Sequence, residues 1–233
     1  MAVRKYTGTT DLKGKVSKQN PATESMVNFL SYFFGMKKVG TVNADSSLTS
    51  VHATGRGFDI RCYDYNTNTW LSSGFEERNW NLINYLYMYR DYLGVEEIHD
   101  YIGLYVWGTM ARYDGSGRGS SLGYGAGYRC SRDNVQEAFA PTGWKRWNLE
   151  AHKSHGGDSV GLKHIHVEMS PASVKDQKQL ESKLNVSIGA YLKLYWHSVA
   201  LIGSGSNAYA LGTRIFAPVI PPARKITEIL KRI

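Results

Sequence analysis

The chain has 233 residues, 42% of them hydrophobic, which is enough to bury the core of one large domain without disulfide bonds. This composition excludes wholesale disorder, and the 24 glycines, which follow no fixed period, exclude a collagen-like chain. The net charge of +8 favours an anionic partner: nucleic acid, anionic lipid or an acidic cell-wall polymer. Charge alone does not choose among them, and a basic protein without such a partner has the same composition.

The first residues, Met1 to Leu12, carry charges and lack the apolar segment of a secretory signal. No stretch of about 18 uninterrupted apolar residues predicts a transmembrane helix. The two cysteines, Cys62 and Cys130, form no CxxC pair. We therefore expect synthesis in a reducing cytoplasm with free thiols, and no transmembrane segment.

Hydrophobic periodicity and turn residues predict the secondary structure along the chain. In chain order, we expect an arm or edge strand over residues 1–20, a helix over 22–37 with Thr23 as N-cap, a strand over 56–65, a helix over 75–93 that ends at Gly94, one or two strands over 95–113, a glycine-rich loop over 114–127, a short helix over 133–140, an irregular loop over 141–161, a strand over 162–169, a helix over 172–185, an apolar and aromatic segment over 188–202, and a basic amphipathic end over 224–233.

Two segments carry residues suited to metal chemistry. In Ser50-Val-His52-Ala-Thr-Gly-Arg-Gly-Phe-Asp59, a glycine-rich turn runs into a strand and can fold the imidazole of His52 back over the carboxylate of Asp59. In His164-Ile-His166, the spacing of two residues puts both imidazoles on one face of a strand. Three side chains from this set could hold a zinc ion, because a catalytic zinc needs three protein ligands and one open position for water. Either segment alone also fits a purely structural role.

The same two segments resemble a known family. SVHATGRGFDI is similar to the SxHxxGxxxD signature of the LAS metallopeptidases, the group of lysostaphin, D-alanyl-D-alanine peptidases and sonic hedgehog, and KHIHVEM resembles their closing His-x-His strand. Between them, HDYIGLYVWGTMAR and GWKRWNLEAH are similar in order and spacing to phage lysin and actinobacterial wall-hydrolase domains. The resemblance covers roughly residues 45–171.

The resemblance implies an α+β fold, with a small antiparallel sheet carrying a zinc site and helices flanking it. It implies Zn2+ ligands at His52, Asp59 and His166, and a role for His164 in stabilising the oxyanion. Ser50 would support the turn. The implied function is hydrolysis of a peptide bond in the stem or cross-bridge of peptidoglycan, as in a phage endolysin or virion-associated lysin that acts at the wall after release or as part of a particle.

The expected domain organisation has three parts, of which the resemblance covers the central one. Residues 1–44 form an N-terminal arm and helix packed on the core, residues 45–171 form the metallopeptidase core, and residues 172–233 form a C-terminal helical extension of unknown role. The basic end of this extension, residues 224–232, is a candidate contact for anionic wall polymer.

The general base is missing from its usual place. Many relatives carry Glu, Asp or His three to five residues before the ligand histidine, where this chain has Gly161, Leu162 and Lys163. The nearby candidates are Asp158, His155, His152 and Glu150. Of these we select His155 and Asp158, one of which a loop would have to bring within about 3 Å of the reacting water. This departure leaves open a protein that binds metal without being an enzyme.

Two other functions fit parts of the sequence. A relaxase-type DNA nickase carries a His-hydrophobic-His strand and a nucleophilic tyrosine, for which Tyr191 and Tyr195 are candidates, and the positive charge suits nucleic acid. That interpretation leaves His52 and Asp59 unexplained. The other is a phage structural protein that keeps an inactive peptidase fold, which would explain the missing base.

Overall fold

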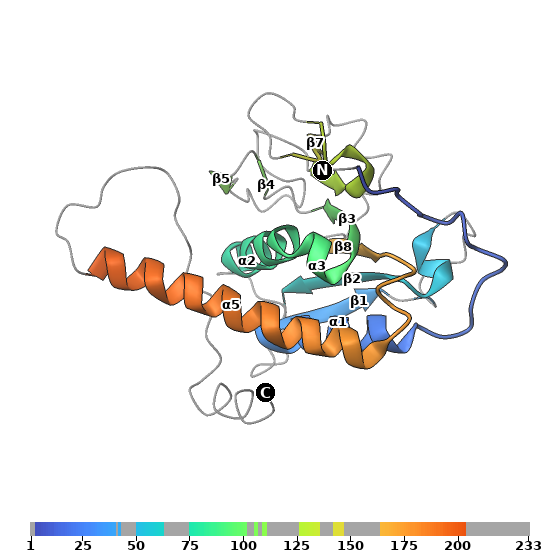
Figure 1. Ribbon diagram of the computed structural model, residues 1–233, viewed down its shortest axis with the longest axis horizontal. Coiled ribbons are helices and arrows are strands. Elements are labelled where there is room, and N and C mark those ends of the chain that lie inside the picture. The colour runs from blue at the N-terminus through green and yellow to red at the C-terminus, as the bar shows by residue number, and fades with distance from the viewer. Residues whose placement is uncertain are drawn as a thin grey trace.

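The fold is a mixed α+β arrangement in which helices pack on one face of an antiparallel sheet (Figure 1). The computed structural model describes residues 3–40, 42, 50–62, 75–101, 105–106, 109–110, 126–135, 142–146 and 164–203. Its main sheet has six strands in the order β1-β2-β8-β3-β6-β7, and a separate pair joins β4 to β5. The expected α+β class with an antiparallel sheet is therefore confirmed.

The strand order places segments far apart in sequence side by side. The strands of the main sheet are β1 (Met36–Gly40), β2 (Gly57–Cys62), β3 (Val95–Asp100), β6 (Ala126–Arg129), β7 (Trp144–Arg146) and β8 (Ile165–Met169). The short pair is β4 (Tyr105–Val106) and β5 (Thr109–Met110). β8, the last strand in sequence, lies between β2 and β3 and is antiparallel to both. It therefore occupies the centre of the sheet.

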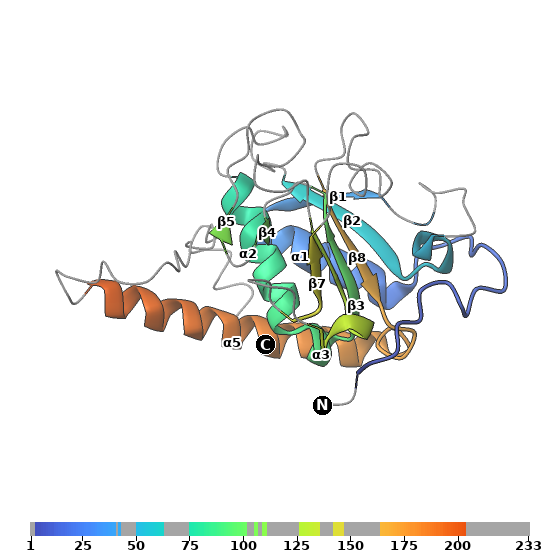
Figure 2. The same ribbon diagram turned by 90° about the horizontal axis from the view of Figure 1, so that it is seen from above.

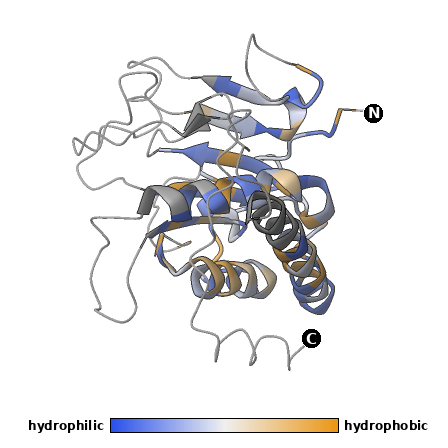
Figure 3. Cartoon of the chain, turned by 90° about the vertical axis from the view of Figure 1, so that its left-hand side faces the viewer, coloured by the Kyte–Doolittle hydropathy of each residue, from blue (hydrophilic) through white to orange (hydrophobic). Residues whose placement is uncertain are grey.

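Alternation along the central strands separates an apolar face from a polar face. Phe58 and Ile60 of β2 pair with Val167 and Ile165 of β8, and all four side chains are fully buried. They belong to one hydrophobic core with residues of α1 (Pro21–Phe34), α2 (Phe75–Met88) and α5 (Gln177–Gly203). Figure 3 shows both hydrophobic and hydrophilic positions along these helices. The helices thus cover the apolar face, and the opposite face carries polar residues.

The first helix begins earlier than its apolar stripe predicts. Asn20 is the N-cap, because its side chain accepts hydrogen bonds from the backbone N–H groups of Ala22 and Thr23, and Pro21 occupies the first turn. The prediction of Thr23 as N-cap is wrong; Thr23 is buried inside the helix. Gly35 ends the helix in the left-handed conformation, with φ of 63°.

The helix expected over 75–93 forms in two pieces. α2 ends at Met88, and α3 (Arg90–Leu93) follows and ends at Gly94, the predicted C-cap, with φ of 75°. The strands expected over 95–113 are β3, β4 and β5. Within residues 133–135, the described part of the short helix expected over 133–140, the chain forms a turn, and a 3-10 turn, η2 (Cys130–Arg132), precedes it.

The last helix begins later and runs further than expected. Residues 171–174 form a turn in which Ser173 N–H donates to Ser170 Oγ at 3.2 Å, and the helix starts only after Asp176, whose carboxylate accepts from Gln179 N–H at 3.0 Å. The helix then continues through the apolar segment to Gly203. In Figures 1 and 2, α5 lies along α1 and its end extends past the rest of the described fold. No helix in the described residues is both long and apolar enough to cross a membrane.

An N-terminal arm, residues 3–20, runs over the sheet without forming the edge strand that the sequence allowed. The buried guanidinium of Arg56 donates to the backbone oxygen of Gly8 at 2.6 Å and to the carboxylate of Asp11 at 2.8 Å. On the other side of Tyr6, Arg4 donates to the backbone oxygen of Val95 at 2.8 Å. These bonds hold the arm on both sides of Tyr6.

Candidate metal centre

His52 lies in a one-turn 3-10 helix, η1 (Val51–Thr54), that packs against the start of β2. Ser50 caps this turn, since its hydroxyl accepts from His52 N–H at 3.3 Å, and Gly55 ends it with φ of 74°. Gly57 has no side chain to separate the turn from the strand: a Cβ there would lie 3.0 Å from the His52 backbone nitrogen. The role expected for Ser50 agrees with this geometry.

Asp59 extends from β2 on the polar face of the sheet. The neighbouring position on β1 is Gly40, which is paired with Asp59 at an irregular step in the register. A Cβ on Gly40 would overlap the Oδ2 atom of Asp59. The absence of a side chain at Gly40 therefore leaves the space that the Asp59 carboxylate occupies.

His164 immediately precedes β8 and His166 lies within it, and the two share the polar face, as their spacing predicts. His166 is directly opposite Asp59 on β2 and His99 on β3. Both histidines of the pair are buried, with 5% and 7% of their surface exposed. The sheet order thus brings Asp59 and His166, which are 107 positions apart in sequence, into contact.

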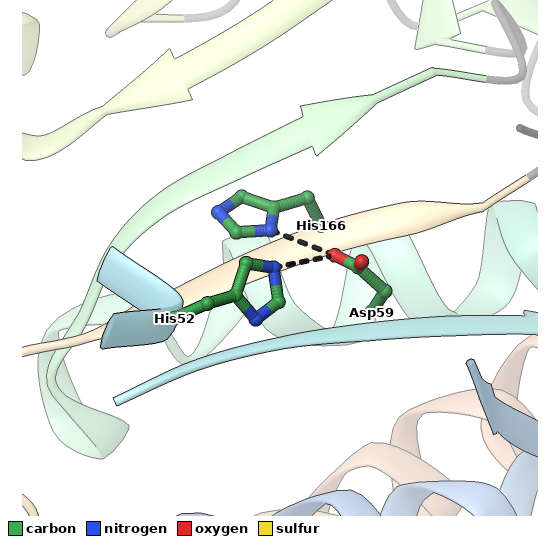
Figure 4. A group of neighbouring side chains, drawn as sticks. All are labelled: His52, Asp59 and His166. Carbon is green, nitrogen blue, oxygen red and sulfur yellow. Dashed lines mark hydrogen bonds and ion pairs between the residues drawn. The ribbon is translucent and has the colours of Figure 1, made fainter. Parts of the chain in front are cut away.

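His52, Asp59 and His166 form a group whose candidate ligand atoms all lie within 4.8 Å of one another (Figure 4). The Oδ1 atom of Asp59 is 3.2 Å from Nε2 of His52 and 2.8 Å from Nδ1 of His166. Tetrahedral ligands about 2.1 Å from a zinc ion are roughly 3.4 Å apart. Two imidazoles and one carboxylate at this spacing could hold a metal ion.

The charges of the group are strongly coupled. Burial opposes ionisation of Asp59, but hydrogen bonds from His166 and His52 outweigh it and hold the pKa of the carboxyl well below its usual range. Burial also opposes protonation of His166, yet its bonds to Asp59 and Glu168 raise the pKa of this imidazole to about 10. The two groups therefore form a buried ion pair when no metal is bound.

His164 differs from its neighbour. Burial, together with the positive charges of nearby groups, lowers the pKa of His164 to about 4, although Asp59 opposes the shift. Its Nε2 is 3.7 Å from Oδ1 of Asp59, and among the described residues no hydrogen-bond partner meets its Nδ1. At neutral pH, His164 is thus an uncharged imidazole next to the ligand group, able to donate one hydrogen bond and to accept another.

A second row of polar residues lies on the same face of the sheet, two positions along β8 from His166. Glu168 on β8 is opposite Glu97 on β3, and Glu97 is opposite Arg129 on β6. Oε1 of Glu168 is 3.1 Å from Nε2 of His166, and the hydroxyl of Tyr6 is 2.7 Å from Glu168 and 2.8 Å from Glu97. The sequence offered one signal for this row, since Glu168 continues the alternation of His164 and His166.

His99 lies beside this group, directly opposite His166 on β3. Its side chain is buried, its Nε2 is paired with Glu97, and its ring lies 5.5 Å from that of His166. Tyr101 follows on the same face, with its ring 4.9 Å from that of His164. A lone histidine gives no sequence signal of such a position, because only the pairing of β3 with β8 creates it.

Other predicted residues lie outside the described part of the chain or on the apolar side of the sheet. The candidate bases His155 and Asp158 lie outside the described residues, as does the basic end at 224–232. Tyr191 lies on the apolar side: its ring packs 5.5 Å from that of Tyr85 and 6.4 Å from that of Phe34 within the hydrophobic core. The side chain of Tyr195 is also outside the described set.

A scan of the chain against protein-family models finds no match, and comparisons with curated proteins and with solved structures likewise find none.

Proposed function

We propose that the protein is a zinc-dependent peptidase of the hedgehog and D-alanyl-D-alanine peptidase type that cleaves peptidoglycan, as a phage endolysin or virion-associated lysin does. The observation that carries the proposal is the convergence of His52, Asp59 and His166 on one polar face of an antiparallel sheet. Their ligand set is two nitrogens and one carboxylate oxygen, which leaves one tetrahedral position open. When bound, zinc acidifies a water molecule and polarises the carbonyl of the substrate.

The remaining chemistry belongs to the chain's own side chains. His164 is an uncharged imidazole whose Nε2 is 3.7 Å from the Asp59 carboxylate. A neutral N–H here can donate to the oxyanion that develops on the substrate, and one such donor is worth about 2.7–4 kcal/mol in a water-excluded site. The proton of the attacking water would pass to His155 or Asp158, the two candidate bases.

The nickase hypothesis is less consistent with the position of Tyr191, one of its two candidate tyrosines. Its chemistry needs a tyrosine hydroxyl beside the histidine pair, but Tyr191 packs on the opposite side of the sheet, where its hydroxyl is 3.4 Å from the backbone oxygen of Asn81. A phage structural protein with an inactive peptidase fold remains the alternative that the missing base favours.

The first test is the metal content of the full chain purified without added metal, measured by elemental mass spectrometry. We expect about one zinc per chain, followed by release of peptide fragments and loss of turbidity when the protein is added to purified peptidoglycan. Absence of zinc, with magnesium or manganese needed for DNA nicking, would replace the proposal with the nickase. Stoichiometric zinc without cleavage of walls from a broad panel of bacteria would favour the inactive structural protein.

A further inference from the structure

The carboxylate of Glu168 contacts one of the candidate metal ligands, His166. It meets Nε2 of His166 at 3.1 Å, while Nδ1 of the same ring lies 2.8 Å from Asp59. A carboxylate at one ring nitrogen of a histidine fixes the proton there and directs the lone pair of the other nitrogen at the metal. Glu168 thereby selects Nδ1 of His166 as the ligand atom.

The N-terminal arm supplies the partner of Glu168. The Tyr6 hydroxyl is within hydrogen-bond distance of both Glu168 and Glu97, but it has a single proton to donate. Glu97 already accepts from Arg129, at 2.9 Å from Nε and 2.8 Å from a terminal nitrogen, and is paired with His99. Because Glu97 already has these partners, we assign the hydrogen bond donated by the Tyr6 hydroxyl to Glu168.

The placement of Tyr6 does not depend on its hydroxyl alone. The guanidinium of Arg129 stacks 4.3 Å from the centre of the Tyr6 ring. Thr7, the next residue, donates its hydroxyl to Glu96 at 2.8 Å. The arm thus remains docked if the Tyr6 hydroxyl is removed, which makes Tyr6→Phe a clean test of the hydrogen bond.

We propose that Glu168 and Tyr6 are positioning residues of the metal centre: Glu168 orients His166, and Tyr6 holds Glu168 in place, so that the N-terminal arm is part of the site. This inference rests on the proposed zinc site and does not depend on the substrate. It assigns a role in metal binding to the arm of residues 3–20, although the arm is far from the ligands in sequence.

The experiment measures the zinc dissociation constant of the full chain by competition with a chromophoric chelator, and urea unfolding of the same proteins without metal. We expect Glu168→Ala to weaken zinc binding about 10–100-fold and Tyr6→Phe to weaken it about fivefold. Glu168→Gln, which keeps an acceptor oxygen, should retain more affinity than Glu168→Ala. Visible spectra of the cobalt-loaded proteins should show an altered ligand geometry in Glu168→Ala.

The matched control is Tyr85→Phe, which removes a buried hydroxyl bonded to Ser187 at 2.6 Å on the apolar side of the sheet. It should lower the free energy of unfolding without changing zinc affinity. Equal zinc affinity in the wild type, Tyr6→Phe and Glu168→Ala would overturn the inference, as would an equal loss in Tyr85→Phe. Failure of the wild type to bind zinc would instead overturn the proposed function, and the inference with it.

Discussion

The two faces of the central sheet are built from the same strands, yet their side chains differ in chemistry. On one face, Phe58, Ile60, Ile165 and Val167 are fully buried against the helices, and each buried side chain of this size contributes about 1.5–3 kcal/mol to folding. On the other face, alternate residues of the same strands are carboxylates and imidazoles, whose burial costs free energy unless each finds a partner. Hence substitutions on the apolar face should act on stability, and those on the polar face on metal binding.

Removing a ligand should have the largest effect on the polar face. We expect His52→Ala and His166→Ala to abolish zinc retention while the fold survives, because a three-ligand site that loses one ligand loses most of its affinity. Zinc content and circular dichroism of the purified variants check this, with His197→Ala in α5 as the histidine control. Stoichiometric zinc in both ligand variants would contradict the assignment.

Substitution of the candidate general bases should lower the rate of catalysis without changing metal binding. We expect His155→Ala and Asp158→Asn each to keep zinc, and one of them to reduce the rate of wall lysis by about 10²–10⁴-fold, the usual contribution of a general base. Turbidity loss of purified walls gives the rate, and zinc content is the control. Unchanged rates in both variants would place the base elsewhere.

On the apolar face, Ile98→Ala should show the opposite pattern. Ile98 is fully buried on β3, one residue from His99 on the polar face. We expect the free energy of unfolding to fall by about 2–5 kcal/mol, as for other large-to-small core substitutions, with the zinc affinity of the folded protein unchanged. Urea titration and chelator competition measure the two quantities, and a loss of zinc affinity as large as that expected of Glu168→Ala would contradict the distinction between the faces.

Substitution of Gly40 tests whether the Asp59 carboxylate needs the space that the missing side chain leaves. A methyl group at Gly40 would overlap Oδ2 of Asp59, so Gly40→Ala should displace the carboxylate and weaken zinc binding by about tenfold, the lower end of the range for disturbed outer residues of metal sites. Gly189→Ala is the matched control, since a Cβ there meets no described atom within 4 Å apart from the neighbouring backbone of its own helix. Equal zinc affinity in the two variants would show that the carboxylate adapts.

The smallest expected effect is the pH dependence of the contribution that Glu97, in the second row of polar residues, makes to stability. Burial tends to raise the pKa of Glu97, but His99 and Arg129 lower it below its ordinary value of 4.5. A lowered pKa stabilises the fold above the unfolded-state pKa, and that contribution is lost as the pH falls through the folded-state pKa. The unfolding free energy of the wild type should therefore exceed that of Glu97→Gln by about 1–3 kcal/mol at pH 7.

This difference should shrink as the pH is lowered below about 4.5. Urea unfolding of both proteins in the presence of a chelator measures it, because the chelator removes any contribution from metal release. A difference that stays constant from pH 7 to pH 3 would show that Glu97 acts through packing and not through its charge.

Local patterns in the sequence predicted much of the fold. The alternation around His164 and His166 gave a strand with the imidazoles on one face, and the glycine-rich turn before Asp59 gave a His52 that folds back over β2. Helix boundaries were less accurate where capping overrode periodicity, as at Asn20 and Asp176. The break between α2 and α3 left no clear sequence signal.

By itself, the sequence determined which residues share a face of each strand, because side-chain alternation depends only on the backbone of that strand. Only the tertiary structure decided which strands are neighbours, because the pairing of β8 with both β2 and β3 depends on hydrogen bonds and core packing contributed by the whole chain. That pairing brings Asp59 to His166, adds His99 and Glu97 beside them, and lets the hydroxyl of Tyr6 reach Glu168, which is 162 positions away in the sequence.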